Sequence, residues 1–236
     1  MSKIGSFFIF HAKALMKDKI TLIWILLLPI FLIVINLFVS GEILKSMDQK
    51  LTAIALFLSF ITMMILLNGI AIEIANIREQ GALKSYVMLA GSKYPFLFAI
   101  ILSQMIVLFI SLEVMTILTS LVLNIFSLKL LLYVVIYTIL LLPISVIFLA
   151  IALLPFKASS LATISSIITI IFYYFSNSHL YGFEWLNPLY FFRSFGLLIL
   201  NNFTDFNGLI LLIYVLYFLI GYISLVKLDI NSKTIR

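Results

Sequence analysis

Two carboxylates lie within or beside long apolar runs of the chain, where a charge is costly. Glu73 lies toward the end of one run and Glu113 lies deeper in the next. Ionisable side chains inside a membrane usually face a polar cavity, an ion path or a buried partner, so both are candidates for a transport pathway. Asn68 and Gln104 fit either the same cavity or hydrogen bonds between helices. Glu73 can equally lie at the membrane interface near Arg78, and Glu113 can equally serve helix packing.

Motifs for catalysis are absent from the sequence. It contains no H-E-x-x-H, no G-x-S-x-G and no Walker A segment. Its two histidines, His11 and His179, are predicted on opposite sides of a membrane, and it has no cysteine. We therefore expect no enzyme activity, no metal site and no cofactor in this chain. If ATP drives its function, the nucleotide must bind a different polypeptide.

The composition is that of a membrane protein. Of the 236 residues, 64% are hydrophobic and only 10% are charged, whereas soluble domains are about a quarter charged. The apolar runs show no two-residue alternation, which favours helices over the strands of a barrel. The net charge of +6 comes from basic residues spread between these runs, so we expect membrane lipid and not nucleic acid as the contacting surface.

Apolar runs and the segments between them predict an all-α membrane protein with a single transmembrane domain, 1–236. Residues 1–19 place basic and apolar side chains on opposite faces, which is typical of a helix lying in the membrane interface. Between the second and third spans lies a polar segment, 76–94, and before the last span lies an aromatic segment, 176–208, predicted as a re-entrant extracellular region. The six predicted spans are 20–40, 51–75, 95–123, 130–154, 158–175 and 209–226.

The distribution of lysine and arginine predicts the orientation. With the N-terminus inside, 11 of the 15 basic residues fall on the cytoplasmic side and 4 on the other. Short loops that carry such an excess normally remain in the cytoplasm. Both termini are therefore predicted to be cytoplasmic.

The polar segment 76–94 combines charged residues with two glycines and an apolar set. Such a mixture predicts a short amphipathic helix whose apolar side binds a partner while its charges fix the orientation. A solvated interfacial helix would have the same pattern, and the periodicity alone leaves both interpretations open.

Three stretches resemble the ABC-2 type transporter permease family, the membrane subunits of a class of ABC exporters. IREQGALK resembles the family's "RE.G.LK" segment after the second span, although Ala82 stands where threonine is frequent. MKDKITLIWILLLPIFLIVI resembles its N-terminal helix and proline-containing first span. WLNPLYFFR resembles its "lNPl.y...R" segment before the last span. The resemblance covers nearly the whole chain, in the right order.

The resemblance implies specific partners and sites. The permease would form a homodimer, or a heterodimer with a second permease, and bind two copies of a cytoplasmic ABC ATPase that hold ATP and Mg. The N-terminal helix, with Lys13 and Lys17, would lie beside the coupling segment. Asn187, Pro188 and Arg193 would close the outer end of the pathway. The residues expected to couple to the ATPase are Arg78, Glu79, Gly81, Leu83 and Lys84.

The apolar, aromatic-rich spans favour hydrophobic or amphipathic cargo. Permeases of this short form resemble bacterial exporters of amphipathic peptides such as bacteriocins or phenol-soluble modulins, which places this chain in the plasma membrane of a bacterium. Lipids or lipid-linked polysaccharides rank second and small drugs third. An ion-coupled secondary transporter or channel using Glu113 is the alternative mechanism, and an intramembrane assembly or immunity protein without transport is a further one.

Overall fold

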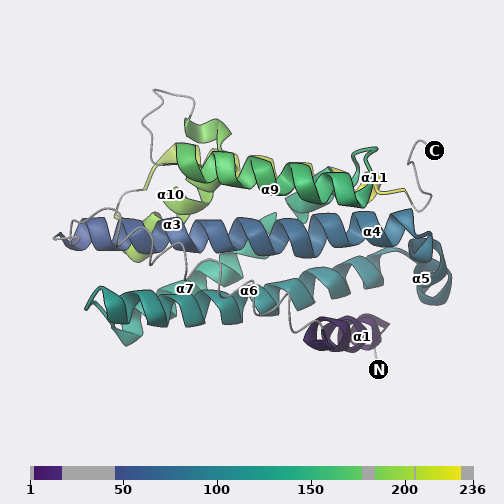
Figure 1. Cartoon of the computed structure of the whole chain (residues 1–236), viewed down its shortest axis with the longest axis horizontal. Helices are drawn as coiled ribbons and strands as arrows, with labels where there is room; N and C mark the ends of the chain where they lie inside the picture. The colour runs from purple at the N-terminus through teal and green to yellow at the C-terminus, as the bar shows by residue number, and fades with distance from the viewer. Residues whose placement is uncertain (1–2, 18–45, 177–183, 205, 230–236) are drawn as a thin grey trace.

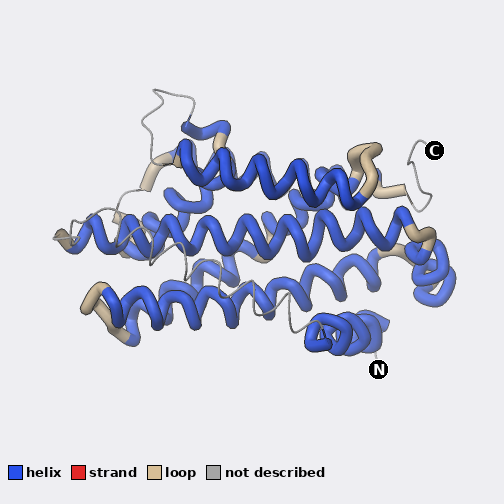
Figure 2. The backbone as a smooth tube through the Cα atoms, in the orientation of Figure 1, coloured by secondary structure: helices blue, strands red, loops and turns tan. Residues whose placement is uncertain are grey.

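A computed structural model describes residues 3–17, 46–176, 184–204 and 206–229. Helices make up nearly all of this part of the chain, and Figure 2 shows no strand within it. The prediction of an all-α fold is confirmed for the described residues. Figure 1 shows the long helices lying roughly side by side along the molecule, with α1 crossing them at one end.

The central helix of the bundle begins at a well-formed cap. Ser46 accepts a hydrogen bond from the backbone of Gln49, and the Gln49 side chain accepts one from the Ser46 backbone, so α3 (Met47–Leu66) starts with a capping box. The helix continues through a π-helical stretch, η1 (Leu67–Ile72), into α4 (Glu73–Glu79). Together these form an apolar helix of 33 residues, much of it buried against α6, α9 and α10.

Glycines separate the next short helix from its neighbours. α5 (Ala82–Ala90) lies between Gly81 and Gly91, whose φ angles are +74° and +77°. Glycine adopts this left-handed conformation without a steric penalty, and it ends helices in this way. The chain then enters α6 (Tyr94–Val122), with Pro95 in its first turn.

The fourth predicted span, 130–154, is broken. It consists of α7 (Leu128–Leu141), a 3₁₀ turn η2 (Ile144–Phe148) and α8 (Leu149–Ala152), and the chain bends by 54° between the two parts. Pro143 lies at the bend, where it has no N–H to donate and its ring displaces the preceding turn. The proline was visible in the sequence, but the size of the bend was not predicted.

The remaining helices enclose this core. α1 (Lys3–Lys17) packs on α6, α9 (Ala158–Phe175) contacts α3 and α4, and α10 (Pro188–Leu200) packs on α3. A short 3₁₀ turn, η3 (Glu184–Leu186), precedes α10. α11 (Gly208–Lys227) packs closely on η2.

Within the described residues, four helices are long and apolar enough to cross a membrane, and the bent pair raises this number to five. The predicted first span, 20–40, lies outside the described residues. At 13 residues α10 is about 20 Å long, which is too short for a hydrocarbon core of about 30 Å. The structure is thus compatible with a multi-pass membrane protein, while six spans and a re-entrant segment remain predictions. The continuous candidate spans are Met47–Glu79, Tyr94–Val122, Ala158–Phe175 and Gly208–Lys227.

Candidate functional site

Arg78 and Glu79 join α4 to other helices. The Arg78 side chain is only 3% exposed, and its Nη2 donates to the Leu154 carbonyl at 3.5 Å. The Glu79 Oε2 accepts from the backbone N–H of Ala158 at 2.7 Å. Ala158 is the first residue of α9, so the carboxylate satisfies a free N–H at the positive end of that helix. Both charges therefore act within the chain.

Lys93 joins the same region to the last helix. Its Nζ donates to the carbonyls of Val226 and Leu228, at 2.7 and 2.8 Å, where α11 ends. A cation at the C-terminus of a helix satisfies free carbonyls and interacts favourably with the helix dipole. Burial lowers the pKa of the Lys93 ammonium, while attraction to Asp229 acts in the opposite direction.

α5 presents a different surface. Leu83 is fully buried and anchors the helix, whereas Lys84 is exposed. Met88 and Leu89 expose 77% and 75% of their surface. Gly81, in the turn before α5, has no atom within 4 Å of the position that a Cβ would take.

α1 lies against α5. Lys3 Nζ donates to the Ala90 carbonyl at 2.9 Å, and the Phe7 ring lies 6.1 Å from that of Tyr86. Tyr86 in turn stacks on Phe96 of α6, with ring centroids 4.5 Å apart. Lys13 and Lys17 of α1 are exposed. We call α1 and α5 together the platform; Figure 1 shows both at the same end of the molecule.

Polar residues inside the spans form two separate groups. Gln104 is buried on α6 and packs directly against Gly69 of η1. Asn68 is exposed and donates to the Met64 carbonyl, and Glu73 lies one turn further along, half-buried. π-helical stretches within α-helices occur frequently at functional sites. Asn68, Glu73 and Gln104 therefore all lie on or beside η1, with Asn68 exposed and Gln104 buried.

Glu113 lies apart from that group. It is nine residues beyond Gln104 on α6, which is about 14 Å along a helix. Its Oε1 is buried and has no hydrogen-bond partner within the described part of the chain, and the same holds for Thr116 Oγ1 one turn on. The predicted set of four pathway residues is thus not a single cluster.

The three predicted gate residues lie at the junction of α9 and α10. Asn187 caps α10 by accepting from Leu189 N at 2.9 Å, and its Nδ2 donates to the Phe172 carbonyl of α9 at 2.8 Å. Pro188 occupies the first position of α10. Arg193 Nη1 donates to the Ser176 carbonyl, just beyond α9, at 2.6 Å.

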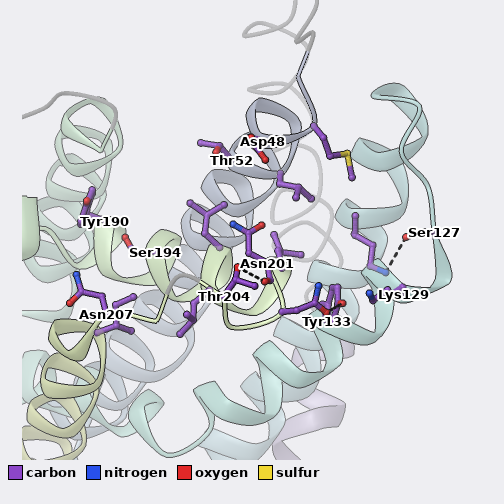
Figure 3. A pocket seen from close by; sticks show the side chains of 18 of the residues that line it. Asp48, Thr52, Ser127, Lys129, Tyr133, Tyr190, Ser194, Asn201, Thr204 and Asn207 are labelled. Carbon is purple, nitrogen blue, oxygen red and sulfur yellow. Dashed lines mark hydrogen bonds between the residues drawn. The ribbon is translucent and has the colours of Figure 1, made fainter.

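A cavity of about 910 Å³ opens beside this junction, which we call the α10 pocket. Figure 3 shows side chains converging on it from α3, α7, α10 and the segment before α11. Trp185, Tyr190 and Tyr133 give it an aromatic lining, and Lys129 Nζ lies 5.5 Å from the centre of the Tyr133 ring. The Tyr133 hydroxyl also bonds the Asn202 side chain. The other polar lining residues are Asp48, Thr52, Ser127, Ser194, Asn201, Thr204 and Asn207.

Sequence reasoning did not find the α10 pocket. Its residues come from segments up to 163 positions apart, as for Met47 and Ile210, and no spacing rule connects them. One signal was present, because amides and hydroxyls cluster in NNFTDFNG directly after the apolar run of α10. An irregular polar segment between two apolar helices often lines a cavity when it lies at membrane depth.

No protein-family model, curated protein or solved structure matches this chain. The interpretation of the site therefore depends on its own geometry. That geometry offers an exposed platform at one end, a mixed polar and aromatic pocket toward the other, and polar residues along the spans between them. Such an arrangement can bind a partner at one end and an amphipathic molecule at the other.

Proposed function

We propose that this chain is the permease subunit of an ATP-driven ABC exporter in a cell membrane. The observation that carries the proposal is the platform. Most charges of the 76–94 segment hold the chain's own helices, yet α5 leaves Met88, Leu89 and Lys84 exposed. Exposed apolar side chains beside a charge, on a helix anchored by one buried leucine, are typical of a surface that docks in a partner's groove.

The partner that we propose for the platform is a cytoplasmic ABC ATPase, in two copies, bound to two permease chains. This chain performs no bond chemistry, because ATP and Mg are held by the ATPase. Closure of the ATPase on nucleotide displaces α5 and biases the permease pair between cytoplasm-facing and outward-facing states. Nucleotide binding to the ATPase thereby changes which side of the membrane the permease cavity opens to.

The α10 pocket supports an amphipathic cargo. Aromatic rings and leucines offer apolar contacts, amides and hydroxyls offer hydrogen bonds, and Asp48 and Lys129 supply one charge of each sign. A short amphipathic peptide presents the same mixture along its length. We rank peptides first and lipids or lipid-linked polysaccharides second.

Co-purification tests the platform. The full chain is co-expressed with a cytoplasmic ABC ATPase from the same source, and the ATPase retained by wild type is compared with that retained by Met88→Asp/Leu89→Asp. We expect the double variant to lose most of the ATPase. Phe126→Asp, a matched exposed apolar site in the α6–α7 turn, should retain it. Equal retention by all three chains would refute the platform as the docking surface.

A transport assay tests the mechanism. Proteoliposomes containing the complex should accumulate a lysine-containing amphipathic peptide only when ATP is supplied to the ATPase side. Peptide movement driven by an ion gradient, with this chain alone, would overturn the exporter in favour of a carrier.

A second function, an ion-coupled carrier, is favoured by one observation. Glu113 Oε1 is buried without a hydrogen-bond partner in the described part of the chain. A carboxylate that takes up a proton or a cation needs such an unoccupied oxygen. The carrier predicts proton flux through vesicles containing this chain alone, abolished by Glu113→Gln. An absence of flux above empty vesicles would exclude it.

A further inference from the structure

α9 has a narrow buried face. Only four of its 18 residues are buried, Ala158, Leu161, Ser165 and Thr169, and they form a single stripe. The rest of the helix exposes apolar side chains such as Ile167, Ile170 and Tyr174. A helix with so few fully buried residues has fewer packing contacts to break when it shifts relative to its neighbours.

Polar side chains from other elements hold α9 at both ends. At its start, Glu79 Oε2 accepts from Ala158 N at 2.7 Å. At its finish, Asn187 and Arg193 donate to the carbonyls of Phe172 and Ser176. These N–H and carbonyl groups are among those that a helix leaves unpaired at its ends, and bonds to charged groups are stronger than neutral ones. α9 therefore connects α4 to α10 over about 27 Å, the length of 18 helical residues.

The far end of this connection lies on the α10 pocket. Tyr190 and Ser194, on either side of Arg193, line the pocket, and Asn187 uses its other side-chain atom to cap α10. The opposite face of α10 packs on α3, where the position of a Cβ on Gly196 would lie 3.7 Å from Ala55 Cβ. α10 thus has a fixed contact on one face and the α9 connection on another. A displacement of α9 would turn α10 about its contact with α3.

We propose that α9 is a connecting helix through which the position of the α4–α5 turn controls the opening of the α10 pocket, with Glu79 as its positioning residue at one end and Asn187 and Arg193 at the other. This inference rests on the proposed function only for the source of the displacement. The connection itself is a property of the single chain.

The test uses the full chain in lipid nanodiscs, without any ATPase. Because the sequence lacks cysteine, a single Ser194→Cys reports the opening of the pocket through its rate of reaction with a water-soluble maleimide. Glu79→Ala removes the acceptor. Ala158→Pro removes the donor at a position where proline fits, since it is the first residue of α9 and Lys157 before it is extended, with ψ 146°.

We expect each variant to raise the labelling rate at Ser194→Cys several-fold. The double variant should give the same rate as either single one, because both remove the same bond. Lys227→Ala, an exposed charge in the last turn of α11 at the same end of the molecule, is the control and should leave the rate unchanged. A cysteine at Phe126 should report the same rate in every background, which separates a local effect from unfolding.

Rates at Ser194→Cys that match wild type in both Glu79→Ala and Ala158→Pro would overturn the connection. Additive effects of the two changes would overturn it as well. If the rates respond as expected but the ATPase does not bind the platform, the exporter is refuted and the connection stands. If the ATPase binds the platform and the rates do not respond, the connection is refuted and the exporter stands.

Discussion

Single residues set how closely the helices of this chain approach. The clearest case is Gly221 of α11, where an added Cβ would lie 2.8 Å from the backbone N of Ile147 and 2.9 Å from the backbone carbon of Val146. Small residues at helix contacts let backbones approach in membranes. A clash with backbone atoms cannot be relieved by a change of rotamer, so the two elements must move apart.

We therefore expect Gly221→Ala to destabilise the protein by about 1–3 kcal/mol, the usual cost of overpacking. Thermal unfolding in detergent, followed by intrinsic tryptophan fluorescence, measures the shift in the unfolding midpoint. Gly208→Ala is the control on the same helix, because its added Cβ meets nothing within 4 Å. An unchanged midpoint for Gly221→Ala would mean that η2 and α11 are less closely packed than described.

Lys93 offers a second test at this scale. Lys93→Met keeps the length of the side chain but removes its bonds to Val226 and Leu228. The last turn of α11 should then open, at a cost of about 1–2 kcal/mol. Hydrogen exchange at 224–228 should increase, while Lys84→Met, which alters an exposed lysine, should leave it alone. Equal exchange in both variants would contradict the assignment.

At the scale of elements, the sequence predicted the helices well, but it predicted the bends and the contacts between helices poorly. The long apolar runs indicated α6, α9 and α11 within one or two residues at each end, because uninterrupted hydrophobicity leaves the backbone few alternatives in lipid. The bends and the contacts between helices depend on tertiary structure. The bond from Glu79 to α9 joins elements distant in sequence, which no local pattern contains. At Pro143 the sequence locates a break, but the 54° angle depends on how the two parts pack against other helices.

The docking of α1 on the bundle depends on pH. His11 is buried on α1, its Nε2 has no partner within the described residues, and burial lowers the pKa of its imidazole below the usual 6.5. The unfolded or undocked state therefore binds more protons below about pH 6.5, so docking of α1 weakens as the pH falls through that value. Above it, His11 is neutral in both states and the full contribution is present.

Hydrogen exchange of α1 measures this effect. Corrected for the intrinsic rate, exchange at 5–15 should be faster at pH 5 than at pH 7.5. His11→Phe cannot be protonated and should remove most of that difference. A pH response of the same size in His11→Phe would assign it to another group.

At the scale of the whole molecule, the described helices place their ends consistently. The platform, the end of α4 and the end of α11 lie at one end, and the start of α3 and the α6–α7 turn lie at the other (Figure 1). Composition and the uninterrupted apolar runs were sufficient to predict an all-helical chain, and the described part contains several helices apolar enough to cross a membrane. These sequence features were not sufficient to predict the α10 pocket, because that cavity is formed where segments distant in sequence meet, each weakly polar by itself.

The orientation of this bundle is a direct prediction. Intact cells expressing Phe126→Cys should react with an impermeant maleimide, whereas Ser85→Cys on α5 should react only after the membrane is opened. Both positions are exposed, so access to the reagent depends on the side of the membrane. The reverse pattern would invert the topology and remove the platform from the cytoplasm.

The narrow buried face of α9 also bears on how the chain is made. α9 has the lowest mean hydropathy of the four continuous candidate spans, because six of its residues are serine or threonine. A translocon that sorts segments by their transfer free energy releases such a helix into lipid less readily than its neighbours. α3 is synthesised about 100 residues earlier and presents Phe60, whose ring lies 5.1 Å from that of Tyr173. Newly made α9 would then leave the translocon by packing on α3, which is already in the bilayer. Substitutions that disrupt α3 would therefore first produce chains in which α9 does not insert into the membrane.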